Sequence, residues 1–190
     1  MSYAYSLKSP LQSVFLTNNS KIKSALWVLA GVFLLAFASQ LNIPFRPIPL
    51  TFQSVTVILI GMAYGPRYGS YVAATYLIAG AVGMPVFASW SSGVETLTGP
   101  TAGYLLSFIP AAFVSGYLAQ SGFANTIGRS FLAACIGTAI IFGIGVSVLS
   151  TSIGWHNAIL FGLLPFVVSE PIKLLAVSVF VPRLWKKRGN

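Results

Sequence analysis

Residues 24–41 read SALWVLAGVFLLAFASQL, a run of 18 residues without a charged side chain. An apolar stretch of about 20 residues is what an α-helix needs to cross the hydrocarbon core of a bilayer. The whole chain is similarly poor in charge, because 56% of its 190 residues are hydrophobic and 7% are charged. Soluble globular domains carry about 25% charged residues. The sequence therefore predicts an integral membrane protein, in which this run is the first helix.

Five further apolar stretches follow, bounded by prolines, glycines or charged residues. In the last of them, residues 169–171 (Ser-Glu-Pro) have the order expected at a helix start, a polar cap followed by proline at the first helical position. We therefore begin the last helix at Pro171 and expect an all-α integral membrane protein with six transmembrane helices. The predicted helices cover residues 24–41, 50–64, about 69–83, about 101–119, 130–153 and about 171–185. We treat residues 1–190 as one membrane domain, with a polar N-terminal segment at 1–23, a six-helix bundle at 24–185 and a basic tail at 186–190.

Basic residues are spread unevenly among the predicted connecting segments. If the N-terminus is inside, Arg46 alone lies on the outer side, and nine lysines and arginines lie on the inner side. Membrane proteins keep an excess of lysine and arginine in their cytoplasmic segments, so we predict that both termini are cytoplasmic. This topology and attraction to anionic lipid account for the net charge of +9, and we predict no nucleic-acid partner. The nine inner residues are Lys8, Lys21, Lys23, Arg67, Arg129, Arg183, Lys186, Lys187 and Arg188.

Three irregular segments fall on the predicted outer side. Residues 43–49 contain three prolines, residues 84–100 are rich in small and polar residues, and residues 154–170 are interrupted by Pro165. Irregular backbone at membrane depth is tolerated where it is buried in protein or lines a cavity. We therefore expect these outer loops to cover a ligand pocket that opens to the outside.

Glu170 and Lys173 are the strongest candidates for a functional site, because both are ionisable and lie within an apolar segment. A charged side chain in a membrane segment is costly and marks a functional site by default. Lys173 could bind a ligand carboxylate, and Glu170, one helical turn away, could accept N–H donors. The alternative is that the two side chains neutralise each other at this i, i+3 spacing, or that Lys173 extends to the membrane surface.

The remaining candidate residues lie in or beside the irregular outer segments. Aromatic rings would form apolar walls, and neutral side chains would form hydrogen bonds. Such a pocket suits a small, partly apolar ligand with one carboxylate and a compact polar head. The candidate wall residues are Phe45, Phe87, Trp90 and Tyr104, and the candidate hydrogen-bonding residues are Thr51, Gln53, Ser91, Ser92 and Thr101.

Some kinds of chemistry have no support in the sequence. It contains no Gly-Lys dipeptide and therefore no GxxxxGK[ST] loop to hold the phosphates of ATP. Uphill transport would need another subunit to supply the energy. The single cysteine, Cys135, excludes an internal disulfide and a cysteine-based metal cluster. We predict a transport protein without catalytic residues, metal or cofactor.

Five motifs occur in an order that resembles one known family. They are IPFRPIPLTFQ at 43–53, GPRYG at 65–69, YLIAGAVGMPVFA at 76–88, GPTAGYL at 99–105, and Glu170 three residues before Lys173. From about Ala30 to Pro182 the chain resembles the BioY family, the biotin-specific substrate-binding components (S components) of energy-coupling factor (ECF) transporters.

The resemblance implies a six-helix protein of the prokaryotic cell membrane that captures biotin from outside. In a complete transporter such a protein sits with a transmembrane coupling subunit and two ATPase subunits. The resemblance also implies that Lys173 binds the valerate carboxylate of biotin, and that Glu170 or nearby neutral groups accept the two ureido N–H groups. Aromatic walls would contact the thiophane ring. Membrane lipid is a further expected partner, and the residues leave open whether the chain forms a homo-oligomer.

Two functions of other classes are compatible with the residues alone. A self-sufficient secondary carrier for biotin or another small carboxylate would need no partner subunit, although Glu95 and Glu170 are the only acids available for a proton relay. An intramembrane serine protease could be built from Ser92 and His156, but the sequence lacks a nucleophile elbow around Ser92.

Overall fold

The computed structural model describes residues 21–186. The predicted N-terminal segment as far as residue 20 and the tail from residue 187 lie outside the described residues, and with them Lys8, Lys187 and Arg188. Within residues 21–186 the regular structure is helical, apart from one two-stranded hairpin. The elements in chain order are α2 (Lys21–Gln40), β1 (Asn42–Ile43), β2 (Leu50–Thr51), α3 (Gln53–Tyr64), α4 (Pro66–Ala81), η1 (Ala88–Trp90), α5 (Val94–Thr98), α6 (Ala102–Leu106), α7 (Phe108–Gln120), η2 (Phe123–Asn125), α8 (Ile127–Ile153), α9 (Trp155–Gly162) and α10 (Leu164–Lys186).

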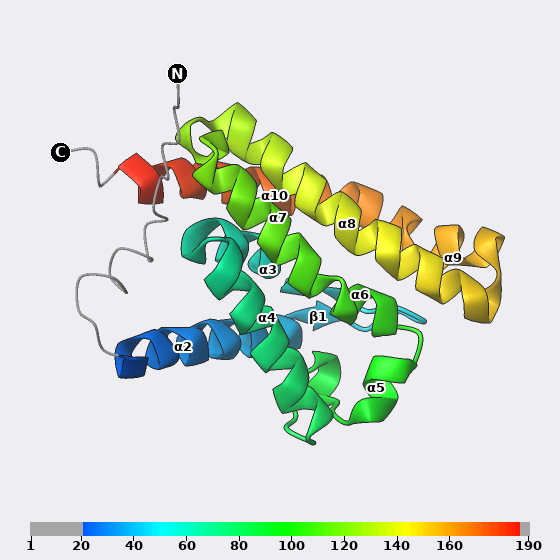
Figure 1. Cartoon of the computed structure of the whole chain (residues 1–190). Helices are drawn as coiled ribbons and strands as arrows, with labels where there is room; N and C mark the ends of the chain where they lie inside the picture. Colours follow the sequence, from blue (N-terminus) through cyan, green and yellow to red (C-terminus); the bar gives the residue numbers. More distant parts are fainter. Residues whose placement is uncertain (1–20, 187–190) are drawn as a thin grey trace.

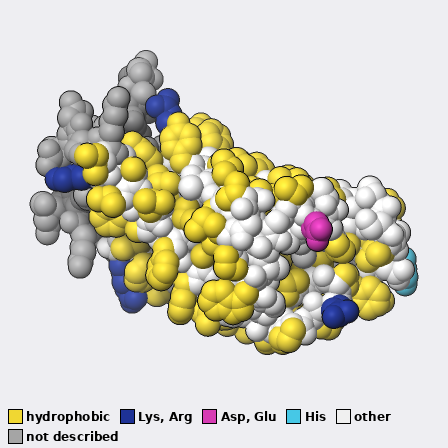
Figure 2. Space-filling model, turned by 90° about the horizontal axis from the view of Figure 1, so that it is seen from below, with side chains coloured by type: hydrophobic (Ala, Val, Ile, Leu, Met, Phe, Trp, Pro, Cys, Tyr) yellow, Lys and Arg dark blue, Asp and Glu magenta, His cyan; other side chains and the backbone are white. Residues whose placement is uncertain are grey.

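Several helices are long and apolar enough to cross a membrane. Figure 2 shows hydrophobic side chains over the middle of the molecule and few charged side chains there, whereas a soluble protein would expose charged residues over its whole surface. Helices α3 and α4 are shorter, with 12 and 16 residues. The fold therefore agrees with the predicted multi-pass membrane protein. Within residues 21–186, four stretches have the required length and composition, Ile22–Gln40, Ala102–Gln120, Ile127–Ile153 and Trp155–Trp185.

Helix α3 lies at the centre of the bundle (Figure 1). Eleven of its 12 residues are buried, and it contacts α2, α4, α7, α8 and α10. Gly61 allows α7 to approach closely, because a Cβ atom at this position would meet the carbonyl oxygen of Ala112 and the hydroxyl of Ser115. Small residues at helix crossings permit such close approach in membrane proteins. The second half of α3 is thus packed directly against α7.

The second and third predicted helices begin at other residues than expected. Residues 50–51, predicted as helical, pair with residues 42–43 as an antiparallel hairpin. The proline-rich connector between them cannot extend the ladder, because proline lacks an N–H donor. Helix α4 begins at Pro66, directly after Gly65 with a φ angle of +81°. The predicted turn through Gly69 is therefore shorter than expected.

The prediction that the last helix begins at Pro171 is wrong. Helix α10 begins at Leu164, so that Pro165 occupies the first turn, where a missing N–H costs no hydrogen bond. Pro171 and Pro182 lie inside the helix. Its 23 residues rise about 35 Å, enough to cross a hydrocarbon core of about 30 Å. Glu170 and Lys173 therefore lie within a long helix and not at its start.

The segments at residues 43–49 and 84–100 lie at one end of the bundle, but the third segment predicted to be irregular, residues 154–170, is helical, because it forms α9 and the start of α10. Figure 1 shows the hairpin, α5 and α9 at the end opposite the start of α2 and the end of α10. Arg46 and Pro47 of the hairpin line a shallow notch with Asn157 and Phe161 of α9, so these two segments also meet. The polar loop after α4 contains the short helices η1 and α5.

Gly61→Ala should destabilise the bundle, because the added methyl group would displace the backbone of α7. Overpacking costs about 1–3 kcal/mol, more than the about 0.5–1 kcal/mol that alanine gains over glycine in a helix. The thermal unfolding temperature of the detergent-solubilised protein measures this effect. Gly143→Ala, in the middle of α8, is the matched control, since no neighbouring element lies within 4 Å of its added Cβ. Equal unfolding temperatures for the two variants would contradict the close contact of α3 with α7.

Candidate ligand-binding site

A buried ion pair joins Lys173 and Glu170, which lie one turn apart on α10. The ammonium nitrogen of Lys173 is 2.8 Å from Oε1 of Glu170. The side chain of Glu170 is 5% exposed and that of Lys173 is 11% exposed. Burying charges is costly unless they are paired and hydrogen-bonded. The stability of this pair therefore depends on what else the two side chains contact.

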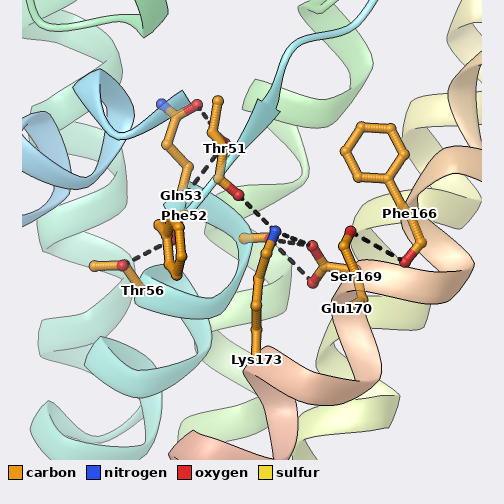
Figure 3. Close-up of polar contacts among 9 residues, drawn as sticks. Thr51, Phe52, Gln53, Thr56, Phe166, Ser169, Glu170 and Lys173 are labelled. Carbon is orange, nitrogen blue, oxygen red and sulfur yellow. Dashed lines mark hydrogen bonds and ion pairs between the residues drawn. The ribbon is translucent and has the colours of Figure 1, made fainter. Parts of the chain in front are cut away.

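The hairpin and α3 supply the further partners of the ion pair (Figure 3). Lys173 Nζ donates to the carbonyl oxygen of Thr51 at 2.8 Å and lies 5.3 Å from the centre of the Phe52 ring. The hydroxyl of Ser54 lies 3.0 Å from each carboxylate oxygen of Glu170, to which it donates. Hydrogen bonds to ionised groups and cation–π contacts are both favourable in a dry site. The pair thus connects α10 to the hairpin and to the start of α3.

The structure confirms one part of the alternative interpretation of Lys173 and Glu170, their mutual neutralisation. The charges neutralise each other, but Lys173 does not extend to the surface. An ammonium group has three donors. Among the described residues, Thr51 and Glu170 use two of them, which leaves one for another partner. A role of either side chain in binding a ligand stays a prediction.

A cavity of about 200 Å³ lies beside the ion pair. Thr51 and Ser54, which bind Lys173 and Glu170, are part of its wall. Pockets for drug-sized ligands measure about 300–1,000 Å³, so this cavity suits a small molecule. The lining residues are Ile48, Pro49, Thr51, Gln53, Ser54, Ala88, Ser91, Thr96, Thr101, Tyr104, Leu105, Phe108, Ile141, Phe142 and Phe166.

Three packed aromatic rings form an apolar part of the cavity wall. The rings of Tyr104 and Phe142 meet edge to face with their centroids 6.0 Å apart, and those of Phe142 and Phe166 are 4.9 Å apart. The hydroxyl of Tyr104 donates to the carbonyl oxygen of Gly162 at 2.9 Å, which ties α6 to α9. Edge-to-face pairs are a preferred arrangement of aromatic rings. The wall therefore offers a ligand a well-fixed apolar surface.

Gln53 brings a buried amide into the cavity wall. The amide oxygen of Gln53, Oε1, accepts from the hydroxyl of Thr51 at 3.2 Å. The amide nitrogen of Gln53, Nε2, donates to the hydroxyl of Tyr76 at 2.5 Å. A primary amide has two donors and two acceptor sites, so these contacts leave one N–H and one lone pair. Within residues 21–186, no cluster of His, Cys, Asp and Glu side chains could hold a metal ion. The site therefore offers neutral hydrogen bonds, an ion pair and apolar contact.

Several of the predicted site residues meet at this cavity. Thr51, Gln53, Ser91, Thr101 and Tyr104 all line it. The two charged candidates stand directly behind the wall, bonded to residues that line it. Sequence positions from 51 to 173 are thus brought together around one small space.

Four other predicted residues do not line the cavity. Phe87 is 1% exposed and is buried inside the bundle. Trp90 is 69% exposed and lies beside α2, on the outside of the loop after α4. Phe45 is an exposed residue of the hairpin, and Ser92 is half-buried just before α5. In this structure the aromatic wall is built from other rings.

Ser54, Phe142 and Phe166 line the cavity but are not among the residues predicted from the sequence. Ser54 meets Glu170 across 116 sequence positions, a pairing that no local spacing reveals. The weak signal was its place after Gln53, since two successive polar residues are unusual at the start of an apolar helix. Phe142 and Phe166 lie in apolar stretches, where nothing in the sequence separates a ring that faces a cavity from one that faces lipid.

Comparison with known proteins gives the family. A sequence model of the BioY family matches residues 12–190. The chain belongs to the BioY family. A protein named biotin transporter BioY from Thermotoga maritima is 37% identical over 162 residues, which are 84% of this chain and 95% of that protein. A probable biotin transporter BioY from Pyrococcus horikoshii is 34% identical over 90% of this chain and 99% of its own length.

A solved structure shares the fold of this BioY family member. It is a crystal structure of the S-component for biotin from an ECF-type ABC transporter, with a TM-score of 0.79 over 92% of this chain and 96% of that chain. The two sequences are 24% identical, so the similarity is one of fold. The predicted resemblance to BioY is confirmed. The relatives are named transporters, which agrees with the prediction that the chain is not an enzyme.

Breaking the ion pair one side at a time should destabilise this BioY family member more than breaking both sides together. Lys173→Met leaves a buried carboxylate and Glu170→Gln a buried ammonium, and each loss of one partner costs about 3–5 kcal/mol. The double variant removes both charges and retains a side chain that Ser54 can bind. Thermal unfolding of the wild type, both single variants and the double variant forms a double-mutant cycle. Additive losses would contradict a direct interaction between the two side chains.

Proposed function

We propose that the chain captures biotin from outside the cell as the S component of an ECF-type transporter. Membership of the BioY family, whose members in T. maritima and P. horikoshii are named biotin transporters, supports this substrate. The observation that carries the proposal is the position of the Lys173–Glu170 pair beside a small cavity with an aromatic wall. Biotin has the matching groups: one carboxylate, two ureido N–H donors and a ring of low polarity.

In the proposed complex, Lys173 binds the biotin carboxylate through the donor that Thr51 and Glu170 do not use. Such charge-assisted hydrogen bonds are strong in a site shielded from water. The ligand carboxylate shares the ammonium with Glu170, so binding is most favourable if Glu170 turns an oxygen toward a ureido N–H group. The amide of Gln53 is a second acceptor, and the ring of Tyr104 contacts the thiophane.

We propose six membrane spans, namely α2, α3, α4, the pair α6–α7, α8 and α10. Helices α3 and α4 are short, but α3 is enclosed by other helices and needs no full-length surface toward lipid. Arg67 and Arg129 lie in the first turns of α4 and α8, at the end opposite the hairpin, and Arg183 lies near the end of α10. This excess of positive charge supports an orientation with both termini in the cytoplasm and the hairpin, α5 and α9 outside. The irregular outer segments then cover the pocket.

Closure of the outer segments over biotin would bring the remaining candidate residues to the ligand. Phe45 lies on the hairpin, and Trp90 and Ser92 lie on the loop after α4, so these side chains can approach biotin as the segments move. Phe87, on the same loop, is already buried with its ring against Tyr76 of α4, and it would support the closed position of the loop.

The energy for uptake comes, in this proposal, from a transmembrane coupling subunit and two ATPase subunits. The sequence itself has no GxxxxGK[ST] loop for ATP phosphates. The protein sits in the membrane of a prokaryotic cell, surrounded by lipid.

The purified protein, stripped of ligand, should bind biotin in detergent. Lys173→Met should weaken the affinity about 10- to 150-fold, the loss of about 1.5–3 kcal/mol expected for a hydrogen bond to a charged group. Isothermal titration calorimetry measures both affinities. Lys23→Met is the control, because Lys23 is exposed on the first turn of α2 and should not change binding. Unchanged affinity in Lys173→Met would contradict the carboxylate assignment, and a monodisperse wild type without binding would contradict biotin as the ligand.

Proteoliposomes separate the S component from a self-sufficient carrier. The chain alone should neither accumulate biotin nor hydrolyse ATP, and addition of coupling and ATPase subunits should give ATP-dependent uptake. A secondary carrier would instead accumulate biotin by itself, and a protonophore would abolish that uptake. Uptake by the chain alone would therefore contradict the S component and favour the self-sufficient carrier.

A further inference from the structure

The hydroxyl of Tyr76, on α4, connects two parts of the cavity wall without lining the cavity itself. It accepts a hydrogen bond from Nε2 of Gln53 and donates one to the carbonyl oxygen of Val86, at 2.9 Å. Gln53 is in the cavity wall. Val86 belongs to the loop after α4, which contributes Ala88 and Ser91 to the same wall. The side chain of Tyr76 is fully buried, so its hydroxyl must find partners inside the protein.

We propose that Tyr76 is a positioning residue that sets the orientation of the Gln53 amide and couples it to the loop at residues 84–93. A tyrosine hydroxyl has one hydrogen to donate. Because a backbone carbonyl can only accept, that hydrogen goes to Val86, and the hydroxyl oxygen can only accept from Gln53. The amide must then turn its NH2 group to Tyr76 and its Oε1 to the hydroxyl of Thr51. The loop backbone thereby determines which amide atoms are left for a ligand.

The loop at 84–93 has a conformation that depends on such contacts. Ser89 and Trp90 have φ angles of 56° and 61°, which residues other than glycine rarely adopt. The hydroxyl of Ser39 lies 2.7 Å from the carbonyl oxygen of Val86 and 2.6 Å from that of Ala36, so the two carbonyls share its one hydrogen. The N–H of Trp90 donates to Oε1 of Gln40 at 3.0 Å. These bonds fasten the loop to the end of α2. Tyr76 is the link that fastens it to the cavity wall.

Ligand binding and loop position should therefore depend on each other. If the loop moves away, Val86 no longer takes the hydrogen of Tyr76, and the amide of Gln53 is free to turn over. Conversely, a ligand that holds this amide in place favours the loop position seen here. Coupling of this kind is reciprocal by thermodynamic necessity.

The first experiment is amide hydrogen exchange of the ligand-free protein. Tyr76→Phe keeps the buried ring and removes the hydroxyl, and exchange in residues 84–93 should become about 2- to 10-fold faster, as expected for the loss of one hydrogen bond. Tyr64→Phe is the matched control. Tyr64 ends α3, far from the loop, and its buried hydroxyl donates to the carbonyl oxygen of Trp27 on α2. Removing this hydroxyl should leave exchange in the loop unchanged.

The second experiment is calorimetric titration with biotin, and this arm rests on the proposed function. Tyr76→Phe should weaken affinity about 2- to 10-fold. Gln53→Leu should weaken it as well, and adding Tyr76→Phe to Gln53→Leu should cost little more, because no amide is left to orient. Independent sites would instead show losses that multiply.

The outcomes separate this link from the proposed function. If residues 84–93 of Tyr76→Phe exchange at the wild-type rate, the role of Tyr76 is overturned, even if biotin binds tightly. The same holds if the affinity losses of Tyr76→Phe and Gln53→Leu multiply in the double variant. Failure of the wild type to bind biotin, with faster loop exchange in Tyr76→Phe, would contradict the substrate and support the link. If Tyr76→Phe does not purify as a monodisperse protein, loop exchange in Gln53→Leu decides, since release of the other end of the link should speed exchange and an unchanged loop would overturn it.

Discussion

The ammonium group of Lys173 cannot stay buried without partners, and this constraint determines how three separate elements meet. Its partners are the carbonyl oxygen of Thr51 in the hairpin and the carboxylate of Glu170 on its own helix. Glu170 in turn receives a hydrogen bond from Ser54 at the start of α3. A hairpin with two residues in each strand is not stable alone, so contacts of this kind hold it in place. The ion pair thereby holds two residues of the cavity wall, Thr51 and Ser54, in place.

Close packing of α3 gives these polar contacts a fixed geometry. In a bilayer, helices gain no hydrophobic energy from association, and tight van der Waals contact between small residues takes its place. Gly61 and Gly116 provide this contact between α3 and α7, because a side chain on either would collide with the backbone of the other helix or its connecting turn. The N-terminal turn of α3, which presents Gln53 and Ser54, therefore has little freedom to move. Small residues near one end of the helix thus support the binding groups at the other.

Local sequence rules predicted the membrane fold and singled out Glu170 and Lys173, but they failed where distant residues decide the outcome. Charge scarcity is a property of composition, and an ionisable pair in an apolar stretch is visible without a structure. The start of the last helix was placed at Pro171 because Ser-Glu-Pro resembles a cap, whereas Pro165 already occupies the first turn. Trp90 is predicted as a wall residue and lies outside the cavity, whereas Phe142 and Phe166 line it, because the direction that a ring faces depends on tertiary packing. The order of the five motifs indicated the family, which the patterns of hydrophobicity and charge alone could not.

Thr51 belongs to both polar networks at the cavity, and this has a consequence for binding. Its carbonyl oxygen accepts from Lys173, while its hydroxyl donates to Gln53. In the proposed complex the ligand carboxylate takes the donor of Lys173 that Thr51 does not use, so this anchor of the hairpin is kept. A ligand that also forms a hydrogen bond with Gln53 bridges the two networks and holds both sides of Thr51 in place. A molecule with a carboxylate at one end and hydrogen-bonding groups at the other can form that bridge. A molecule with only one of these features would contact only one of the two networks. Selectivity between ligands would therefore depend on whether a ligand joins the two networks beneath the outer segments, as much as on its contact with any single residue.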